Sequence, residues 1–420
     1  MIFLHKKIFI TLIIGIFFCS ITCYADDITE STTIDKNLID ESIETVSTLN
    51  SSPIINSKAA IIFDRNSKEI LYGKNENIKK PMASTTKIMT ALVVIENSDL
   101  DTVIQISEKA ARTGGSRLNL KTGDKISIRD LLYGLMLKSG NDCAVALAET
   151  IGGSIEEFAN LMNKKSNELN LYNTHFVFPH GLDAEEHYTT AFELAVLTDY
   201  ALKNDTFSKI VGTKTINISI NGQNRTIMNT NELLGNLSGV YGVKTGFTNG
   251  AGRCLVTSTK RDNMDIICIV LGADTKKDRT KDSVKLIEYT FKNYQTITLN
   301  NKIIEYFNNW VNNINSNNIN IKKGVGNHLN LKLDMIDENI SYSIIKNTEN
   351  EIFLNITTNS DFCAPIHTNS QIGKLQVIYK DKIIKEIDIL NINSIPKKNI
   401  NNYLFEFIKN YYTYFEKVTI

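Results

Sequence analysis

Three short motifs occur in one order along the chain and restrict its possible folds more than any other feature. They are Ser84-Thr85-Thr86-Lys87, Ser139-Gly140-Asn141 and Lys244-Thr245-Gly246. Each string alone could arise by chance. In this order they supply a nucleophile, its proton carriers and a cationic anchor from three separate segments, as an acyl-transfer site requires. We therefore expect a fold in which these three segments meet.

The first motif combines a candidate nucleophile with its base. Ser84 and Lys87 are three residues apart, so on a helix they share one face. A serine hydroxyl reacts well only after a base removes its proton. Lys87 can be that base when its amine is neutral, a state that burial or a nearby cation such as Lys244 favours. If Ser84 begins a helix, its N–H also points toward the negative charge that develops on a substrate.

The second and third motifs carry groups that can protonate and hold a substrate. Ser139 can relay a proton to the leaving group, and Asn141 can orient a substrate amide. Lys244 and Thr245 offer a cation and a hydroxyl to a substrate carboxylate. Gly246 leaves room for a ligand backbone to approach.

Composition and periodicity divide the chain into five segments. The first has a basic start and an apolar run from Ile8 to Ile21, which is typical of an export signal cleaved after Ala25, with an uncleaved anchor helix as the alternative. The expected segments are a signal peptide at 1–25, a flexible spacer at 26–52, a catalytic domain at 53–296, a C-terminal β-sandwich domain at 297–395 and an amphipathic helix at 396–420.

The catalytic segment mixes strand and helix signals. The expected elements are a hairpin at 59–72, a helix after Pro81, helices at 128–137 and 142–151, a helix capped by Ser154 with Glu157, strands at 254–259 and 264–271, and a last helix at 281–294. Beyond it, alternating apolar and polar residues predict an all-β domain, with a hairpin through 375–390.

The last segment is rich in aromatic residues. Leu404, Ile408, Tyr411 and Phe415 recur at helical spacing, and other aromatic residues widen this face. Such a helix suits a membrane interface, where aromatic rings lie at the headgroup boundary. Docking on the β domain is the alternative.

Charge and composition exclude other functions. The chain is 42% hydrophobic and 22% charged with a formal net charge of zero, so it lacks the excess of Lys and Arg that nucleic-acid binding needs. His175, His180 and His187 lie close together, which would suit zinc, but no H-E-x-x-H spacing is present. We expect no metal or other cofactor, and we expect buried free thiols at the scattered cysteines after the signal.

With these motifs the chain resembles the low-molecular-mass penicillin-binding proteins of the D-alanyl-D-alanine carboxypeptidase family, serine peptidase family S11. The resemblance covers roughly residues 55–390. Outside the three motifs it rests on Pro179-His180-Gly181-Leu182-Asp183, Asn229-Thr230-Asn231-Glu232-Leu233-Leu234, Phe247-Thr248, Ala364-Pro365-Ile366 and Gly373-Lys374-Leu375.

The resemblance implies a fold, a reaction and a set of site residues. The fold is β-lactamase/transpeptidase-like α/β, an antiparallel sheet flanked by helices, followed by the all-β domain and the terminal amphipathic helix. Ser84 attacks the bond between the last two D-alanines of a peptidoglycan stem peptide, and backbone N–H groups of Ser84 and Phe247 form the oxyanion hole. The implied catalytic residues are Ser84, Lys87, Ser139 and Asn141, and the implied substrate-binding residues are Lys244, Thr245, Gly246, Phe247 and Thr248.

The resemblance also implies partners and a location. Stem peptides are the substrates, and β-lactams such as penicillin are inhibitors that acylate Ser84. The enzyme is exported and lies at the outer face of the cytoplasmic membrane through its C-terminal helix. Phe178 and Tyr241 depart from the residues common in the family, Asn and Asp, which bears on substrate preference.

Two other classes fit parts of the pattern. A class A β-lactamase needs a deacylating Glu ahead of Leu169-Asn170, and Ser166 stands at that position. A non-catalytic wall-binding or penicillin-sensing protein has no need of an intact catalytic set. Endopeptidase activity on cross-links stays open as a variation within the family.

Overall fold

The structure is a computed structural model that describes residues 35–48, 51–316, 321–326, 329–335, 339–358 and 362–418. The chain divides into two compact units, the first ending at Asn293 and the second beginning at Tyr294, close to the boundary expected after residue 296. The export signal expected at 1–25 lies outside the described residues.

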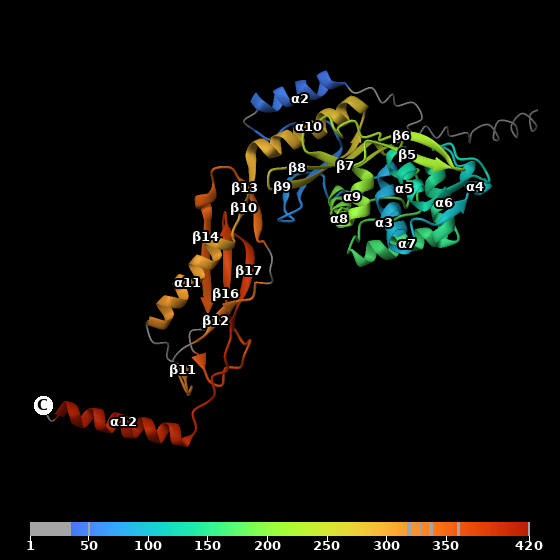
Figure 1. Cartoon of the computed structure of the whole chain (residues 1–420). Coiled ribbons are helices and arrows are strands. Elements are labelled where there is room, and N and C mark those ends of the chain that lie inside the picture. The colour runs from blue at the N-terminus through green and yellow to red at the C-terminus, as the bar shows by residue number, and fades with distance from the viewer. Residues whose placement is uncertain are drawn as a thin grey trace, which may run out of the picture. The chain divides into compact units, whose positions relative to one another are not determined.

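The first unit is built on a five-stranded antiparallel sheet with the order β2-β1-β9-β8-β7. Figure 1 labels β7, β8 and β9 of this sheet. Its strands are β1 (Ala59–Asp64), β2 (Ile70–Lys74), β7 (Val240–Thr248), β8 (Gly252–Arg261) and β9 (Met264–Ala273). The first hairpin and the β8–β9 pair confirm the strands predicted from the sequence. The central strand β9 is buried along its whole length, so both faces of the sheet are covered.

Alternate residues of β9 face the helices that lie on the two sides of the sheet. Ile267, Ile269 and Leu271 belong to the core shared with the helices of the catalytic region. Cys268 points the other way, and its thiol lies 3.9 Å from the carbonyl oxygen of Ser283 on α10 (Lys276–Asn293). The expected α/β arrangement, an antiparallel sheet between helices, is confirmed.

The helices of the catalytic region share one hydrophobic core with the sheet face that carries Ile267. They are α3 (Lys87–Asn97), α4 (Glu108–Ala111), α5 (Ile128–Leu137), α6 (Asn141–Gly152), α7 (Ile155–Glu168), α8 (Ala191–Ala201) and α9 (Asp205–Val211). Side chains cap several of them, as when Ser154 accepts from the Glu157 N–H, which confirms the predicted start of α7. A second sheet, β3-β4-β5-β6, adjoins α5. Its strands are β3 (Val103–Gln105), β4 (Lys125–Ser127), β5 (Thr215–Ile220) and β6 (Gln223–Met228).

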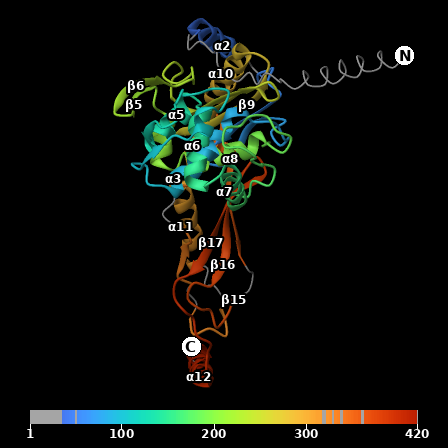
Figure 2. The same ribbon diagram turned by 90° about the vertical axis from the view of Figure 1, so that its right-hand side faces the viewer.

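One helix corrects the expectation of a flexible spacer at 26–52. Lys36–Thr48 form α2, which lies along α10 (Figures 1 and 2). Leu38, Ile39 and Val46 are buried, and Lys292 Nζ donates to the Val46 carbonyl at 3.1 Å near the end of the helix. The apolar residues are few and stand among acidic ones, but their helical spacing gives α2 one face to bury.

The second unit is rich in β structure. A four-stranded antiparallel sheet has the order β12-β17-β16-β14, and two smaller sheets pair β10 with β13 and β11 with β15. The strands are β10 (Tyr294–Thr298), β11 (Ile321–Lys322), β12 (Leu331–Leu333), β13 (Ser341–Ile345), β14 (Ile352–Thr358), β15 (Phe362–Cys363), β16 (Gln371–Tyr379) and β17 (Lys382–Asn391). The hairpin predicted through 375–390 is confirmed as β16–β17.

A helix that the sequence analysis missed interrupts the β domain. α11 (Asn300–Ser316) places Ile303 and Phe307 in the core of this unit, so the domain is β-rich rather than all-β. The apolar residues recur at helical spacing, but the Asn-rich composition of the segment hides them.

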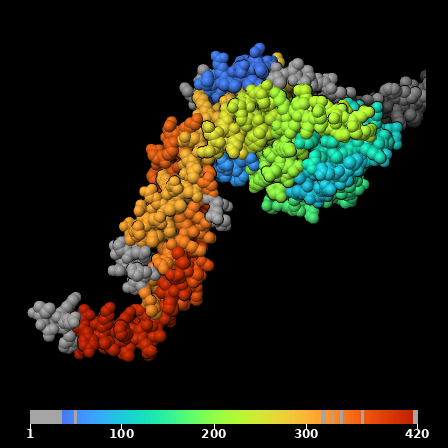
Figure 3. Space-filling view, viewed as in Figure 1, coloured from blue at the N-terminus to red at the C-terminus, as the bar shows by residue number. Residues whose placement is uncertain are grey.

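The terminal helix α12 (Ile400–Val418) forms where it was expected. Tyr403, Phe405, Phe407 and Tyr412 are all exposed, and atoms of this helix, coloured red, lie on the surface in Figure 3. None of the helices in the described parts of the chain is both long and apolar enough to cross a membrane.

The described cysteines are free thiols. Cys143, Cys254 and Cys268 are buried, as expected, whereas Cys363 is exposed, contrary to expectation.

Candidate active site

The first motif forms a tight turn that leads into a buried helix. A 3₁₀ turn, η1 (Ala83–Thr86), runs directly into α3, which begins at Lys87. Ser84 is 3% exposed and Lys87 is fully buried. The two side chains meet as the spacing predicts, with Lys87 Nζ 2.8 Å from Ser84 Oγ.

Lys87 Nζ has two further oxygen neighbours. It lies 2.7 Å from Asn141 Oδ1 and 2.7 Å from the carbonyl oxygen of His180. A neutral amine has two N–H donors and one lone pair. Asn141 and His180 can take the two N–H groups, so the lone pair can accept the Ser84 hydroxyl proton. This geometry suits a general base. The His180 carbonyl was missed because a backbone oxygen leaves no signal in the residue type.

The second motif connects α5 to α6. Ser139 is 4% exposed with φ 58°, and Asn141 is the first residue of α6. The Asn141 side-chain amide donates to the Gly114 carbonyl at 2.9 Å. Asn141 is therefore held by the chain before β4 while its oxygen contacts Lys87.

The neighbouring residue Asp142 was not singled out from the sequence. Its two carboxylate oxygens accept from the backbone N–H groups of Leu118 and Leu120 at 2.9 and 3.0 Å. Asp142 is fully buried. It fixes the segment that carries the Gly114 carbonyl, and through it the position of Asn141.

The third motif lies on strand β7 beside η1, the turn that carries Ser84. A Cβ atom added to Gly246 would lie 3.1 Å from the Ser84 nitrogen and 3.1 Å from the Ala83 Cβ, so the strand passes close to η1. Lys244 and Thr245 are buried, and Thr245 Oγ1 lies 2.8 Å from Thr230 Oγ1. The motif residues on η1, α3, α6 and β7 are thus brought together by side-chain contact or close backbone packing.

The end of β7 is tied to the segment that carries His180. Thr248 Oγ1 donates to Asp183 Oδ1 at 2.6 Å, and the Gly250 N–H donates to Asp183 Oδ2 at 2.9 Å. The Arg253 guanidinium lies 3.8 Å from the centre of the Phe247 ring, a cation–π distance. Asp183, which ties Thr248 and Gly250 to this segment, was not singled out from the sequence, although it lies in one of the resemblance strings.

The histidines structure the loop before α8. Burial is the main cause that lowers the pKa of His180, to about 3. Burial is also the main cause that lowers the pKa of His187, to about 4. Both imidazoles are therefore neutral at pH 7. Within the described parts of the chain, no group of three or more His, Cys, Asp and Glu residues could hold a metal ion.

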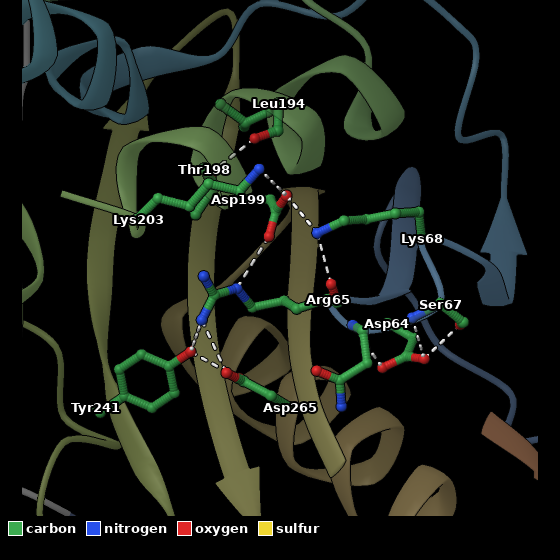
Figure 4. Close-up of polar contacts among 11 residues, drawn as sticks. Asp64, Arg65, Ser67, Lys68, Leu194, Thr198, Asp199, Lys203, Tyr241 and Asp265 are labelled. Carbon is green, nitrogen blue, oxygen red and sulfur yellow. Dashed lines mark hydrogen bonds and ion pairs between the residues drawn. The ribbon is translucent and has the colours of Figure 1, made fainter. Parts of the chain in front are cut away.

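A polar network holds the start of β7 (Figure 4). Arg65 donates to Tyr241 Oη at 2.7 Å, to Asp265 at 2.8 Å and to Asp199 at 3.1 Å. The Tyr241 hydroxyl donates to Asp265 Oδ1 at 2.6 Å. Burial and the neighbouring Asp265 raise the pKa of Tyr241, so the phenol stays a neutral donor. Tyr241 therefore acts in the sheet, where it ties β7 to β9 and to Arg65, the residue directly after β1.

The segment Asn229–Leu234 stabilises the same strand, β7. The Asn231 amide donates to the Gly242 carbonyl at 3.0 Å. Glu232 pairs with the fully buried Arg279 of α10 at 2.7 Å. Burial acts to raise the pKa of Glu232, but Arg279 and the hydrogen bonds to Glu232 outweigh it, so this pKa lies below its usual value. Arg279 was not picked out from the sequence because its partner is distant in the chain.

The site combines a serine beside a buried lysine, an asparagine that contacts the lysine, and an adjoining strand with a cation and hydroxyls. These are the groups that an acyl-transfer site of the serine hydrolase class requires. Family models match both units of the chain. The model of D-alanyl-D-alanine carboxypeptidases matches residues 46–275, and that of the penicillin-binding protein 5 C-terminal domain matches residues 312–397. The chain belongs to the D-alanyl-D-alanine carboxypeptidase family and is a serine peptidase.

Individual relatives agree. The chain is 33% identical over 355 residues to the D-alanyl-D-alanine carboxypeptidase DacF of Bacillus subtilis, a match that covers 83% of this chain and 88% of the relative. It is 29% identical over 372 residues to DacA of Escherichia coli K12, covering 85% and 88%. The solved structure of penicillin binding protein 5 from Haemophilus influenzae matches with a TM-score of 0.68 and 27% identity, covering 83% of this chain and 99% of that one.

Proposed function

We propose that this chain removes the terminal D-alanine from peptidoglycan stem peptides through an acyl-enzyme on Ser84. Lys87 takes the hydroxyl proton while Ser84 Oγ bonds to the penultimate D-alanine carbonyl carbon. The peptide C–N bond then breaks, and D-alanine leaves with a proton relayed through Ser139. Water hydrolyses the ester and restores Ser84. The 2.8 Å Lys87–Ser84 contact, with two other oxygens for the remaining N–H groups, carries this proposal.

In this proposal β7 holds the substrate. Lys244 and Thr245 bind the substrate carboxylate, and Gly246 lets the peptide backbone lie along the strand. Phe247 and Ser84 direct their backbone N–H groups at the oxyanion. The support is the approach of β7 to η1 at Gly246, which brings the strand beside the Ser84 nitrogen. Thr248 completes this wall, and its hydroxyl is held by Asp183.

Penicillins would react at the same serine. The β-lactam ring presents a strained amide beside a carboxylate, and attack by Ser84 leaves an ester to which the broken ring stays attached. Because the leaving amine cannot diffuse away, the ester is released slowly. Ser166 lies in helix α7, and its hydroxyl donates to the Leu171 carbonyl at 3.1 Å. A class A β-lactamase has a carboxylate at this position that activates water, so a serine here supports slow release of the ester.

We also propose that the chain is exported by residues 1–25 and lies against the outer face of the cytoplasmic membrane through residues 396–420. The exposed aromatic residues of α12 support this contact. The membrane contact is tested by comparing the binding of the full chain to phospholipid vesicles with that of a chain that ends at Asn393. Equal sedimentation of the two with vesicles would contradict it.

The reaction is tested with a synthetic stem peptide that ends in D-alanyl-D-alanine. Released D-alanine is measured for the full chain, Ser84→Ala and Ser42→Ala. Ser42 is a matched control because it is a buried serine of α2 that bonds to its own helix at Leu38. We expect Ser84→Ala to lose at least about 10³-fold of the rate, with Ser42→Ala unchanged. Full activity of Ser84→Ala would refute the assignment.

A further inference from the structure

His187 lies behind the nucleophile turn and has both ring nitrogens engaged. It is 2% exposed. The Val177 N–H donates to His187 Nδ1 at 3.0 Å, so Nδ1 carries no proton in the neutral ring. The proton is then on Nε2, which lies 2.7 Å from Thr86 Oγ1. His187 is thus a donor to Thr86.

Thr86 connects His187 to Ala83, the residue before the nucleophile. The Thr86 hydroxyl accepts from His187 and donates to the Ala83 carbonyl at 2.8 Å. Ala83 has φ 48°, in the left-handed region that costs a non-glycine residue energy. Such a conformation persists only when its surroundings hold it, and the Thr86 hydroxyl is one of the groups that do so.

The same loop touches the nucleophile helix at two more points. Thr90 Oγ1 donates to the Pro179 carbonyl at 2.6 Å, and Lys87 Nζ contacts the His180 carbonyl. Side chains 86, 87 and 90 therefore bond to one segment, 179–187. In the contact with Thr86, the 179–187 segment contributes a side chain, the His187 imidazole. In the contacts with Lys87 and Thr90 it contributes backbone carbonyls.

We propose that His187 is a positioning residue for acylation, which it supports by holding Thr86 and, through Thr86, the Ala83–Ser84 backbone. The inference rests on the proposed role of Ser84 as nucleophile. The hydrogen bonds of His187 go to Thr86 and Val177, so His187 acts through Thr86 and makes no bond to Ser84. It sets where Ser84 Oγ lies relative to the Lys87 amine, so it affects the chemical step and leaves substrate affinity nearly unchanged.

Two pairs of variants separate a hydrogen-bond role from a packing role. His187→Leu removes both ring nitrogens, and His187→Gln keeps a side-chain N–H donor for Thr86. Thr86→Val removes the hydroxyl at equal volume, and Thr86→Ser restores it. Thr198→Val is the matched control, because Thr198 is buried and its hydroxyl bonds to its own helix at Leu194, 2.7 Å away.

The readouts are the rate of penicillin adduct formation by intact mass, kcat and KM for D-alanine release, and thermal unfolding. We expect His187→Leu and Thr86→Val to slow acylation and kcat by about 10- to 100-fold, as a misplaced nucleophile would, with KM changed less than about threefold. His187→Gln, Thr86→Ser and Thr198→Val should stay within about fivefold of the unaltered chain. The double variant His187→Leu/Thr86→Val should be no slower than the slower single variant.

Each other outcome overturns the inference. Acylation of His187→Leu at the unaltered rate, equal slowing by Leu and Gln, or additive effects in the double variant would show that His187 does not act through Thr86. If His187→Leu does not fold, His187→Phe, which keeps a planar ring without a ring nitrogen, takes its place beside His187→Gln under the same criteria. An unaltered chain that forms no adduct on Ser84 would instead refute the proposed function on which the inference rests.

Discussion

Replacing Gly181 with alanine should uncouple the nucleophile turn from the loop that carries the His180 carbonyl. Gly181 has φ +88°, and an added Cβ would lie 2.0 Å from the Ala83 carbonyl oxygen and 2.6 Å from Thr86 Oγ1. Neither atom can remain in place. Relief of the clash moves the Ala83 backbone, which precedes Ser84, or the His180 carbonyl, which contacts Lys87 Nζ at 2.7 Å.

The expected magnitude has two parts. The left-handed conformation costs an alanine about 1–2 kcal/mol, and the forced contact adds about 1–3 kcal/mol of overpacking. A displacement of the reacting groups by about 1 Å costs about 100-fold in rate. We therefore expect Gly181→Ala to lower the free energy of unfolding by about 2–5 kcal/mol and the acylation rate by about 100-fold.

A matched glycine separates backbone strain from the clash. Gly153 has φ +77°, and an added Cβ there would meet nothing within 4 Å. Gly153→Ala should lose about 1–2 kcal/mol and keep the full acylation rate. Both variants are measured by urea unfolding and by the rate of penicillin adduct formation. If Gly181→Ala is acylated as fast as Gly153→Ala, the contact between this loop and the nucleophile turn does not position Ser84.

Three further predictions test other parts of the structure. Because His180 and His187 have pKa values of about 3 and about 4 when folded and about 6.5 when unfolded, acid protonates the unfolded chain first. The free energy of unfolding should fall as the pH drops below about 6.5, by about 3–4 kcal/mol between pH 7 and pH 5 for the two histidines together. His187→Gln should show about half of that loss. If urea unfolding gives the same pH dependence for His187→Gln and the unaltered chain, the prediction is contradicted. Asp183→Ala should raise KM for the stem peptide by about tenfold, because Thr248 loses the acceptor for its hydroxyl, while an unchanged KM would show that Thr248 needs no such support. Leu38→Ala should weaken the packing of α2 on α10 by about 2–3 kcal/mol. This should appear as faster proteolysis near residue 36 with unchanged kcat, whereas a lower kcat would show that α2 contributes to catalysis.

The sequence predicts the site better than the contacts that position it. The contact of Ser84 with Lys87 follows from helical spacing, and the meeting with Asn141 follows from the order of the motifs. The His180 carbonyl and the Asp142 carboxylate escaped notice because their roles depend on backbone atoms of distant segments. A residue type does not reveal a bond to a peptide group more than twenty positions away.

The fold shows the same division between local and distant causes. The hairpin of β1 and β2 and the capped start of α7 follow from periodicity and a capping serine, which act within a few residues. Helices α2 and α11 were missed because each buries a narrow apolar face among acidic or Asn-rich residues. Their stability comes from packing against distant elements, α10 for α2 and the C-terminal core for α11.

The central claim is that Ser84 is the nucleophile and that Lys87 activates it. Its most direct test is mass spectrometry of the full chain mixed with penicillin, followed over time, with peptide mapping of the adduct. We expect one penicillin per chain on the peptide that contains Ser84, persisting for many minutes, and greatly slowed acylation in Lys87→Met. An adduct on another residue, or none while D-alanine is still released, would contradict it.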